Sequence, residues 1–286
     1  MISDFEIFRQ APGWVQTNTK LIENFNDAVD VMSAKHPVGL IPKNIFDVSE
    51  LAAISKLLPY MPIEKYDNTD ATEDVKVWGK TFVDSKSFDE YLSSSPDTQF
   101  YTLVMPVFKK LKKYFESLGF NVATLTDSYT MLTYSYMVAR IISVPEDCTN
   151  VHGNKCTVLH FDDFLRDAML KSDFSEGRLP IGITANNYEQ FSVCVPIGNG
   201  FFKPDYLEVY DYRYFPKDRK ELKNWRVARN MNGVGTHKHT PKTGEPYFFN
   251  TMNCHDVLGG DSRSKRINLS IFFLYVKETN TLYPYN

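Results

Sequence analysis

Hydrophobic residues recur at helical spacing in the first part of the chain. Residues 20–35 carry apolar side chains three and four positions apart, and residues 48–61 repeat this spacing, with Ser49 placed to cap the start. Residues 97–118 form the longest such segment, with apolar side chains on one side, lysines mostly on the other, and Gly119 as a C-terminal cap. Pro106 lies inside this segment and is expected to kink or split the helix.

After about residue 120 the pattern changes to that of strands. Segments rich in Val, Ile, Tyr, Phe and Thr are separated by clusters of Gly, Pro, Asn and Asp. These segments are residues 129–142, 157–161, 191–197, 206–214, 246–251 and 267–276. In the last segment, alternate residues share one face, and these are Ile267, Leu269, Ile271 and Phe273. The set predicts a mainly β fold, an antiparallel sandwich or jelly roll, with the N-terminal helices packed on one outer face of its sheet.

The two patterns are expected to belong to a single domain. Residues 1–120 form its mostly helical part, and residues 121–286 form the jelly-roll core. Residues 217–245 are basic and polar and contain glycines, which predicts a long loop between two strands. Loops of this length in compact domains are often functional.

Composition and charge exclude a few classes of protein. The chain is 43% hydrophobic and 23% charged with a net charge of −3, so nothing draws it generally to nucleic acid or to acidic membranes. Its start lacks the pattern of a secretory signal, and no apolar run approaches the length of a membrane span. The cysteines are scattered without a C-x-x-C pair, so we expect reduced thiols in a cytoplasmic protein.

The segment HFDDF, residues 160–164, carries the candidate chemistry. His160 and Asp162 stand two positions apart after a short apolar run, so on a strand both side chains project to the same side, and Asp163 projects to the other. His255 follows a strand-like segment near the end of the chain. Two histidines and one carboxylate can occupy one face of an octahedral iron(II) and leave three positions open for substrate and dioxygen.

Arg266 begins the last predicted strand and suits a dicarboxylate cosubstrate. Its planar guanidinium can bind the far carboxylate with two hydrogen bonds, while the keto-acid end of the same molecule chelates the metal. Ser270 has the spacing to face the same way and to add a hydroxyl. Tyr134 or Tyr136 on the first predicted strand can add another, and the sequence leaves the choice between them open.

The order H-x-D, a long interval, H, and then R about ten residues later resembles the iron(II)- and 2-oxoglutarate-dependent oxygenases. The resemblance spans roughly residues 130–276, and GEPYFFNTMNCHDVLGGDSRSKRINLSIFF resembles the second half of the family's core. It implies a double-stranded β-helix, which is a cupin-like jelly roll. In that fold, His160, Asp162 and His255 would bind Fe(II), Arg266 would bind 2-oxoglutarate, and O2 would be the second cosubstrate. Many relatives have a serine two residues after the arginine, where this chain has Asn268.

The resemblance also limits the reaction and the substrate. Asp162 argues against halogenation, because halogenating members have a small residue there; hydroxylation, desaturation and ring closure at an unactivated C–H bond stay open. We expect a small molecule as the substrate, and not a nucleic acid or a peptide, because the sequence resembles no docking module for either. Candidate substrate-binding residues are Arg166, Arg226, Arg229 and His239. The arginines suit a carboxylate, which favours an amino-acid-derived substrate in a specialised biosynthesis.

Three alternatives stay open at this point. His237 and His239 form a second H-x-H pair that can bind a metal instead, although no carboxylate stands at a useful spacing. The same oxygenase chemistry can act on a protein side chain, docked on residues 217–245. The chain can also be a metal-binding jelly roll that is no oxygenase, in which case it does not turn over 2-oxoglutarate.

Overall fold

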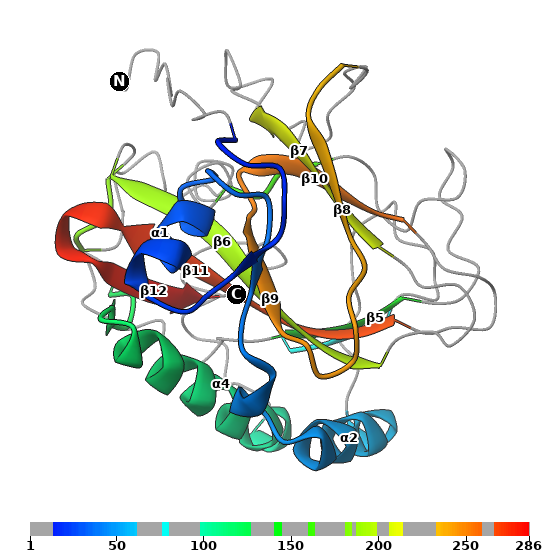
Figure 1. The fold of residues 1–286 in the computed structure, drawn as a ribbon. Coiled ribbons are helices and arrows are strands. Elements are labelled where there is room, and N and C mark those ends of the chain that lie inside the picture. The colour runs from blue at the N-terminus through cyan, green and yellow to red at the C-terminus, as the bar shows by residue number, and fades with distance from the viewer. Residues whose placement is uncertain are drawn as a thin grey trace, which may run out of the picture.

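The computed structural model describes residues 14–61, 76–79, 98–126, 140–144, 160–163, 181–184, 187–198, 206–213, 233–258 and 266–285. Within these ranges the chain forms two β-sheets and a set of α-helices (Figure 1). The helices are α1 (Phe25–Met32), α2 (Val48–Leu57) and α4 (Thr98–Ser117). In this described part, no helix combines the length and the apolar character that crossing a membrane requires.

The larger sheet is organised around two long antiparallel strands. β6 (Tyr188–Gly198) pairs with β11 (Arg266–Val276) along nearly its whole length. On its other edge, β11 pairs first with β5 (Arg140–Val144) and then with β12 (Thr281–Tyr285). The remaining strands lie further out: β9 (Tyr247–Asn250), β2 (Gly39–Leu40) and β1 (Lys20–Leu21) beyond β6, β4 (Asn121–Val122) beyond β12, and β3 (Lys76–Trp78) beyond β5.

The smaller sheet contains the strands that carry His255 and the pair His237 and His239. Its order is β10 (Asn253–Leu258), β7 (Tyr206–Arg213) and β8 (Thr236–His239), and all pairs are antiparallel. It lies on one side of the larger sheet, and α2 and α4 lie on the other side (Figure 1). The fold is therefore a jelly roll with helices on one outer face, as the sequence predicted.

Strand alternation in β6 and β11 separates the two faces of the larger sheet. Odd-numbered residues, such as Phe191 and Ile271, pack into the core formed with the helices. Even-numbered residues face the smaller sheet, where Cys194 packs with Leu207 and Val209. The face predicted from Ile267, Leu269, Ile271 and Phe273 is confirmed as the helix-packed one.

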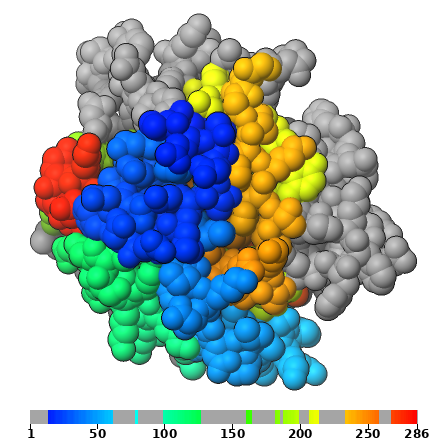
Figure 2. Space-filling model, viewed as in Figure 1, coloured from blue at the N-terminus to red at the C-terminus, as the bar shows by residue number. Residues whose placement is uncertain are grey.

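Phe115 of α4 occupies the centre of the helix-packed core. Its ring lies 6.0 Å from Phe191, 6.1 Å from Phe248 and 5.5 Å from Phe273, measured between centroids and in edge-on geometry. These three residues come from β6, β9 and β11, so one side chain of α4 packs against three strands in the middle of the sheet. Figure 2 shows the N-terminal segment (blue) lying between the β11–β12 end (red) and the segment that contains β8 and β9 (orange).

The predicted helices are confirmed with changed ends. The segment 20–35 begins with β1, and α1 starts only after Asn24, whose side chain accepts from the Asp27 amide at 3.1 Å. Ser49 is not the cap of α2: Asp47 is, because its carboxylate accepts from the Ser49 amide at 2.8 Å. Both residue types favour this position, so the sequence alone did not separate them.

The long helix is continuous, so the expectation that Pro106 splits it is wrong. Proline has no amide proton, so the backbone carbonyl one turn earlier lacks its usual helical hydrogen bond. Pro106 lies on the exposed side of α4, where water can bind that carbonyl instead. Gly119 is confirmed as the C-terminal cap. Its φ is +103°, and the Phe120 amide donates to Phe115 and the Gly119 amide to Glu116, as in a Schellman motif.

The segment 217–245 is not one continuous loop. Its residues 236–239 form β8, which pairs with β7 from Thr236 opposite Tyr210 to His239 opposite Leu207. The polar sequence THKH did not predict a strand. Only one face of β8 is turned toward the protein interior, so the strand carries no apolar pattern. His255 follows β9, as expected, and itself lies within a further strand, β10. Residues 129–139, 157–159 and 217–232 lie outside the described ranges.

Replacing Phe115 by alanine is expected to lower the free energy of unfolding by about 3–5 kcal/mol, because the fully buried ring leaves a cavity between helix and sheet. Denaturant unfolding followed by circular dichroism measures this. The matched control is Tyr60→Ala, since Tyr60 is 81% exposed and should cost less than about 0.5 kcal/mol. Equal losses in the two variants would contradict the described core.

Candidate metal centre

A pair of backbone hydrogen bonds brings two distant histidines together. The His160 amide donates to the His255 carbonyl at 3.0 Å, and the His255 amide donates to the His160 carbonyl at 2.8 Å. Residues that exchange both bonds in an antiparallel pair stand directly opposite each other with their side chains on the same face. The two imidazole rings accordingly lie 4.3 Å apart between centroids.

Asp162 completes the group from the same extended segment as His160. Its Oδ2 lies 4.0 Å from Nε2 of His160 and 3.5 Å from Nε2 of His255. The Asp162 amide donates to the Thr251 carbonyl at 2.9 Å, so the backbone is fixed on the turn that precedes β10. The sequence prediction that position 162 faces both histidines is therefore confirmed by the geometry.

The ring of His255 is oriented by its own strand. Its Nδ1 lies 2.9 Å from the Asn253 carbonyl, an acceptor that holds a proton on Nδ1 and leaves the lone pair on Nε2. The Phe249 ring packs against the imidazole in T-shaped geometry, 4.9 Å away between centroids. His255 is only 4% exposed, so its free nitrogen has a defined direction, toward Asp162.

The donor set fits a divalent transition metal. One nitrogen from each histidine and one carboxylate oxygen all lie within 4.8 Å of one another, and no other group of this kind is found among the described residues. Two neutral imidazoles and one carboxylate suit iron(II) in a facial arrangement with open positions. The Asp162 side chain is 21% exposed, which leaves the group accessible from one side.

Asp163, the rival carboxylate, faces away from this group. It accepts a hydrogen bond from the Tyr188 hydroxyl, and its side chain is buried. Phe161, on the same side of the strand, packs with Tyr210 and Cys254 on the opposite face of the smaller sheet. Strand alternation thus decides between the two neighbouring aspartates, as predicted.

The H-x-H pair on β8 does not form a second centre among the described residues. Both ring nitrogens of His237 are engaged, Nδ1 with the Thr17 carbonyl at 3.0 Å and Nε2 with the Thr19 hydroxyl at 2.9 Å. Burial lowers the pKa of His237, so the ring stays neutral near pH 7. His239 is buried between the sheets, with its ring 4.5 Å from Tyr247, and does not lie in a polar loop.

β11 contributes polar side chains to the face that looks toward the smaller sheet. Ser270 is buried there, with its hydroxyl 3.9 Å from the Cys194 sulfur. Asn268 is 6% exposed, and its Oδ1 has no hydrogen-bond partner among the described residues. Because buried polar atoms are nearly always paired, this amide marks a position where a ligand can bind. For Arg266 the structure describes the backbone, opposite Val144 of β5.

The other candidate residues lie outside the described ranges. These are Tyr134, Tyr136, Arg166, Arg226 and Arg229.

The sequence did not predict the residues that support the centre. Thr251 and Asn253 act through backbone carbonyls, which carry no residue-specific signal, and their position depends on the pairing of β10 with β7.

Comparison with known proteins gives a likeness in fold. No family model matches the chain, and a search of curated proteins finds no match. An N-substituted L-amino acid dioxygenase from Burkholderia ambifaria, solved in complex with α-ketoglutarate, is 12% identical with a TM-score of 0.50; the match covers 90% of this chain and 89% of that one. This chain therefore has the fold of that protein.

Two further solved structures are similar at lower TM-scores. An oxidoreductase of the 2OG-Fe(II) oxygenase family from Burkholderia pseudomallei is 14% identical, with a TM-score of 0.47 and coverage of 90% of this chain and 95% of that one. A non-heme α-ketoglutarate-dependent epimerase from nogalamycin biosynthesis is 11% identical, with a TM-score of 0.46 and coverage of 82% and 77%.

Asp162→Ala is expected to weaken binding of divalent iron at least about 100-fold, because it removes the one anionic donor. Anaerobic titration of the metal-free protein with Fe(II) against a competing chelator measures the affinity. Asp163→Asn is the matched control: it changes the neighbouring carboxylate but retains an acceptor for Tyr188. Unchanged affinity in Asp162→Ala, or an equal loss in both variants, would contradict the assignment.

Proposed function

We propose that this chain is an iron(II)- and 2-oxoglutarate-dependent dioxygenase that oxidises an unactivated C–H bond of a small substrate. The observation that carries the proposal is the convergence of His160, Asp162 and His255 at one end of a jelly roll. Two histidines and one carboxylate hold iron(II) on one face and leave the other positions for cosubstrate, dioxygen and substrate. Bound iron would supply the activation of dioxygen, coupled to the oxidation of 2-oxoglutarate.

The protein's own part is to hold the donors and to orient the ligands. The Asn253 carbonyl keeps the proton of His255 on Nδ1, so that Nε2 stays a metal donor without a change of tautomer. Phe249 covers the His255 ring and limits the access of water from that side. The partly exposed Asp162 marks the direction from which ligands enter.

We assign the far carboxylate of 2-oxoglutarate to Arg266. Position 266 lies on β11 an even number of residues before Asn268 and Ser270, and strand alternation favours the same face for all three. A guanidinium can bind that carboxylate with two charge-assisted hydrogen bonds, and the Ser270 hydroxyl can add a third. Tyr134 and Tyr136 are further candidates for this role from the sequence.

We propose a small, amino-acid-derived substrate that bears a carboxylate. The similar dioxygenase from Burkholderia ambifaria acts on N-substituted L-amino acids, and Arg166, Arg226 and Arg229 are the candidate carboxylate-binding residues of this chain. His239, buried beside Tyr247, is a further candidate for contact with the substrate. A cytoplasmic location agrees with the reduced, buried thiols of Cys194 and Cys254.

Succinate formation from 2-oxoglutarate is expected to require Fe(II) and O2 and to rise when free amino-acid derivatives are added. Mass spectrometry of the added compounds would then show an oxygen gained or two hydrogens lost. Stimulation by peptides and not by free amino acids would favour a protein side chain as substrate. No turnover of 2-oxoglutarate under any of these conditions would overturn the oxygenase proposal.

Arg266→Ala should raise the dissociation constant of 2-oxoglutarate on the order of 10- to 100-fold, because two charge-assisted hydrogen bonds are lost. The visible absorption that appears when the keto acid chelates Fe(II) without oxygen measures this binding directly. Lys277→Ala, which removes an exposed cation just after β11, should leave the constant unchanged. If Arg266→Ala binds 2-oxoglutarate as the unaltered protein does, another residue holds the cosubstrate.

A further inference from the structure

The turn between β9 and β10 holds two of the three metal donors through its backbone. The Thr251 carbonyl accepts from the Asp162 amide at 2.9 Å, and the Asn253 carbonyl lies 2.9 Å from His255 Nδ1. Any shift of this turn therefore moves a carboxylate and an imidazole relative to each other. The position of the turn, residues 250–253, decides whether the donors converge.

Backbone pairing alone does not fix this turn. Between Asn253 and His255 the register of β10 against β7 shifts: Asn253 stands opposite Arg213, but His255 already stands opposite Val209. Two positions on β10 thus span four on β7, an irregularity of the kind that re-aims side chains near active sites. The ladder is interrupted one residue before the metal-binding histidine.

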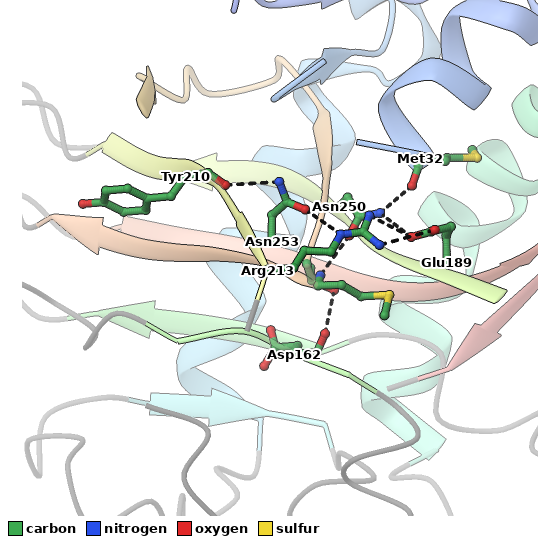
Figure 3. A network of polar contacts seen from close by, with 9 residues as sticks. Met32, Asp162, Glu189, Tyr210, Arg213, Asn250 and Asn253 are labelled. Atoms are coloured by element: carbon green, nitrogen blue, oxygen red, sulfur yellow. Dashed lines mark hydrogen bonds and ion pairs between the residues drawn. The ribbon is translucent and has the colours of Figure 1, made fainter. Parts of the chain in front are cut away.

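The side chain of Asn253 bridges this interruption. Its Nδ2 donates to the Tyr210 carbonyl at 3.1 Å, and its Oδ1 accepts from Nε of Arg213 at 2.9 Å (Figure 3). Asn253 is 1% exposed, so these bonds are sheltered from water. The amide replaces the missing ladder bonds and ties the turn to both ends of the irregular stretch of β7.

Arg213 in turn is anchored on the larger sheet. Its Nη2 lies 2.9 Å from Oε2 of Glu189 on β6, and the arginine side chain is 2% exposed. The same carboxylate oxygen accepts from Nδ2 of Asn250 at 2.9 Å, and Asn250 also donates to the Met32 carbonyl at the end of α1 (Figure 3). Glu189 thus holds both ends of the turn, Asn250 directly and Asn253 through Arg213.

We propose that Glu189 and Arg213 are positioning residues for the metal centre. They contact no metal donor, but they fix the turn whose carbonyls orient His255 and Asp162. The inference rests on the proposed metal centre and adds to it a specific prediction about metal affinity. Residues that orient metal ligands typically change metal affinity by about 10- to 100-fold when replaced.

Glu189→Gln and Arg213→Lys test the proposal with Co(II) as the probe metal. Glu189→Gln keeps the size of the side chain but removes the charge that holds Arg213. Arg213→Lys keeps the charge, but a single ammonium cannot reach Asn253 and Glu189 with the geometry of a guanidinium. We expect Co(II) affinity to fall on the order of 10-fold or more in both, with an altered visible spectrum of the bound ion.

Glu208→Gln is the matched control. Glu208 lies on the same strand as Arg213, is also buried, and forms an ion pair with Lys238 at 3.2 Å, but it does not touch the turn. All titrations are made well below the thermal unfolding transition of each metal-free variant, so that loss of stability alone does not change the measured affinity. The control is expected to bind Co(II) with unchanged affinity and spectrum.

Two results would overturn the inference: wild-type Co(II) affinity in both Glu189→Gln and Arg213→Lys, or an equal loss in Glu208→Gln. A separate variant, His255→Ala, distinguishes failure of this inference from failure of the proposed function. If His255→Ala loses Co(II) while the two positioning variants keep it, only the inference is wrong. If His255→Ala also binds Co(II) as the unaltered protein does, the metal centre itself is elsewhere.

Discussion

The site depends on one antiparallel residue pair, His160 with His255. The two hydrogen bonds that these residues exchange set the separation of their rings before any metal is considered. Asp162 then needs only the two-residue repeat of a strand to reach the same face. Three donors from two distant segments thus meet through ordinary sheet geometry. The local structure has little freedom to place them differently while the pair is formed.

The two faces of β6 and β11 allow this arrangement to be both rigid and accessible. One face is filled by α4 and its neighbours, with Phe115 at the centre, and carries the stability of the fold. The other face presents Ser270 and Asn268 to the smaller sheet, and the buried Oδ1 of Asn268 has no hydrogen-bond partner among the described residues. Substitutions on the two faces should consequently differ in kind: one set affects unfolding, the other affects binding.

Local patterns predicted much of the fold and the donors. Alternation in residues 267–276 gave the helix-packed face, and the spacing of His160 and Asp162 gave their common direction. Local patterns do not predict contacts between residues that only the pairing of distant strands brings together. Glu189, Arg213 and Asn253 are unremarkable polar residues in the sequence and meet only because β7 pairs with β10 beside β6. β8 was missed because one of its faces is polar. Ser49 was preferred to Asp47 because both are cap-forming residue types and stand only two positions apart at the start of α2.

The most direct test of the account is an anaerobic crystal structure with iron(II) and 2-oxoglutarate, with the metal located by anomalous scattering. We predict one iron at about 2.0–2.2 Å from Nε2 of His160, Nε2 of His255 and one carboxylate oxygen of Asp162. 2-Oxoglutarate should chelate it and extend its far carboxylate to the start of β11. Iron bound at another place, or a fully loaded crystal in which His255 takes no part in binding the metal, would contradict the central claim.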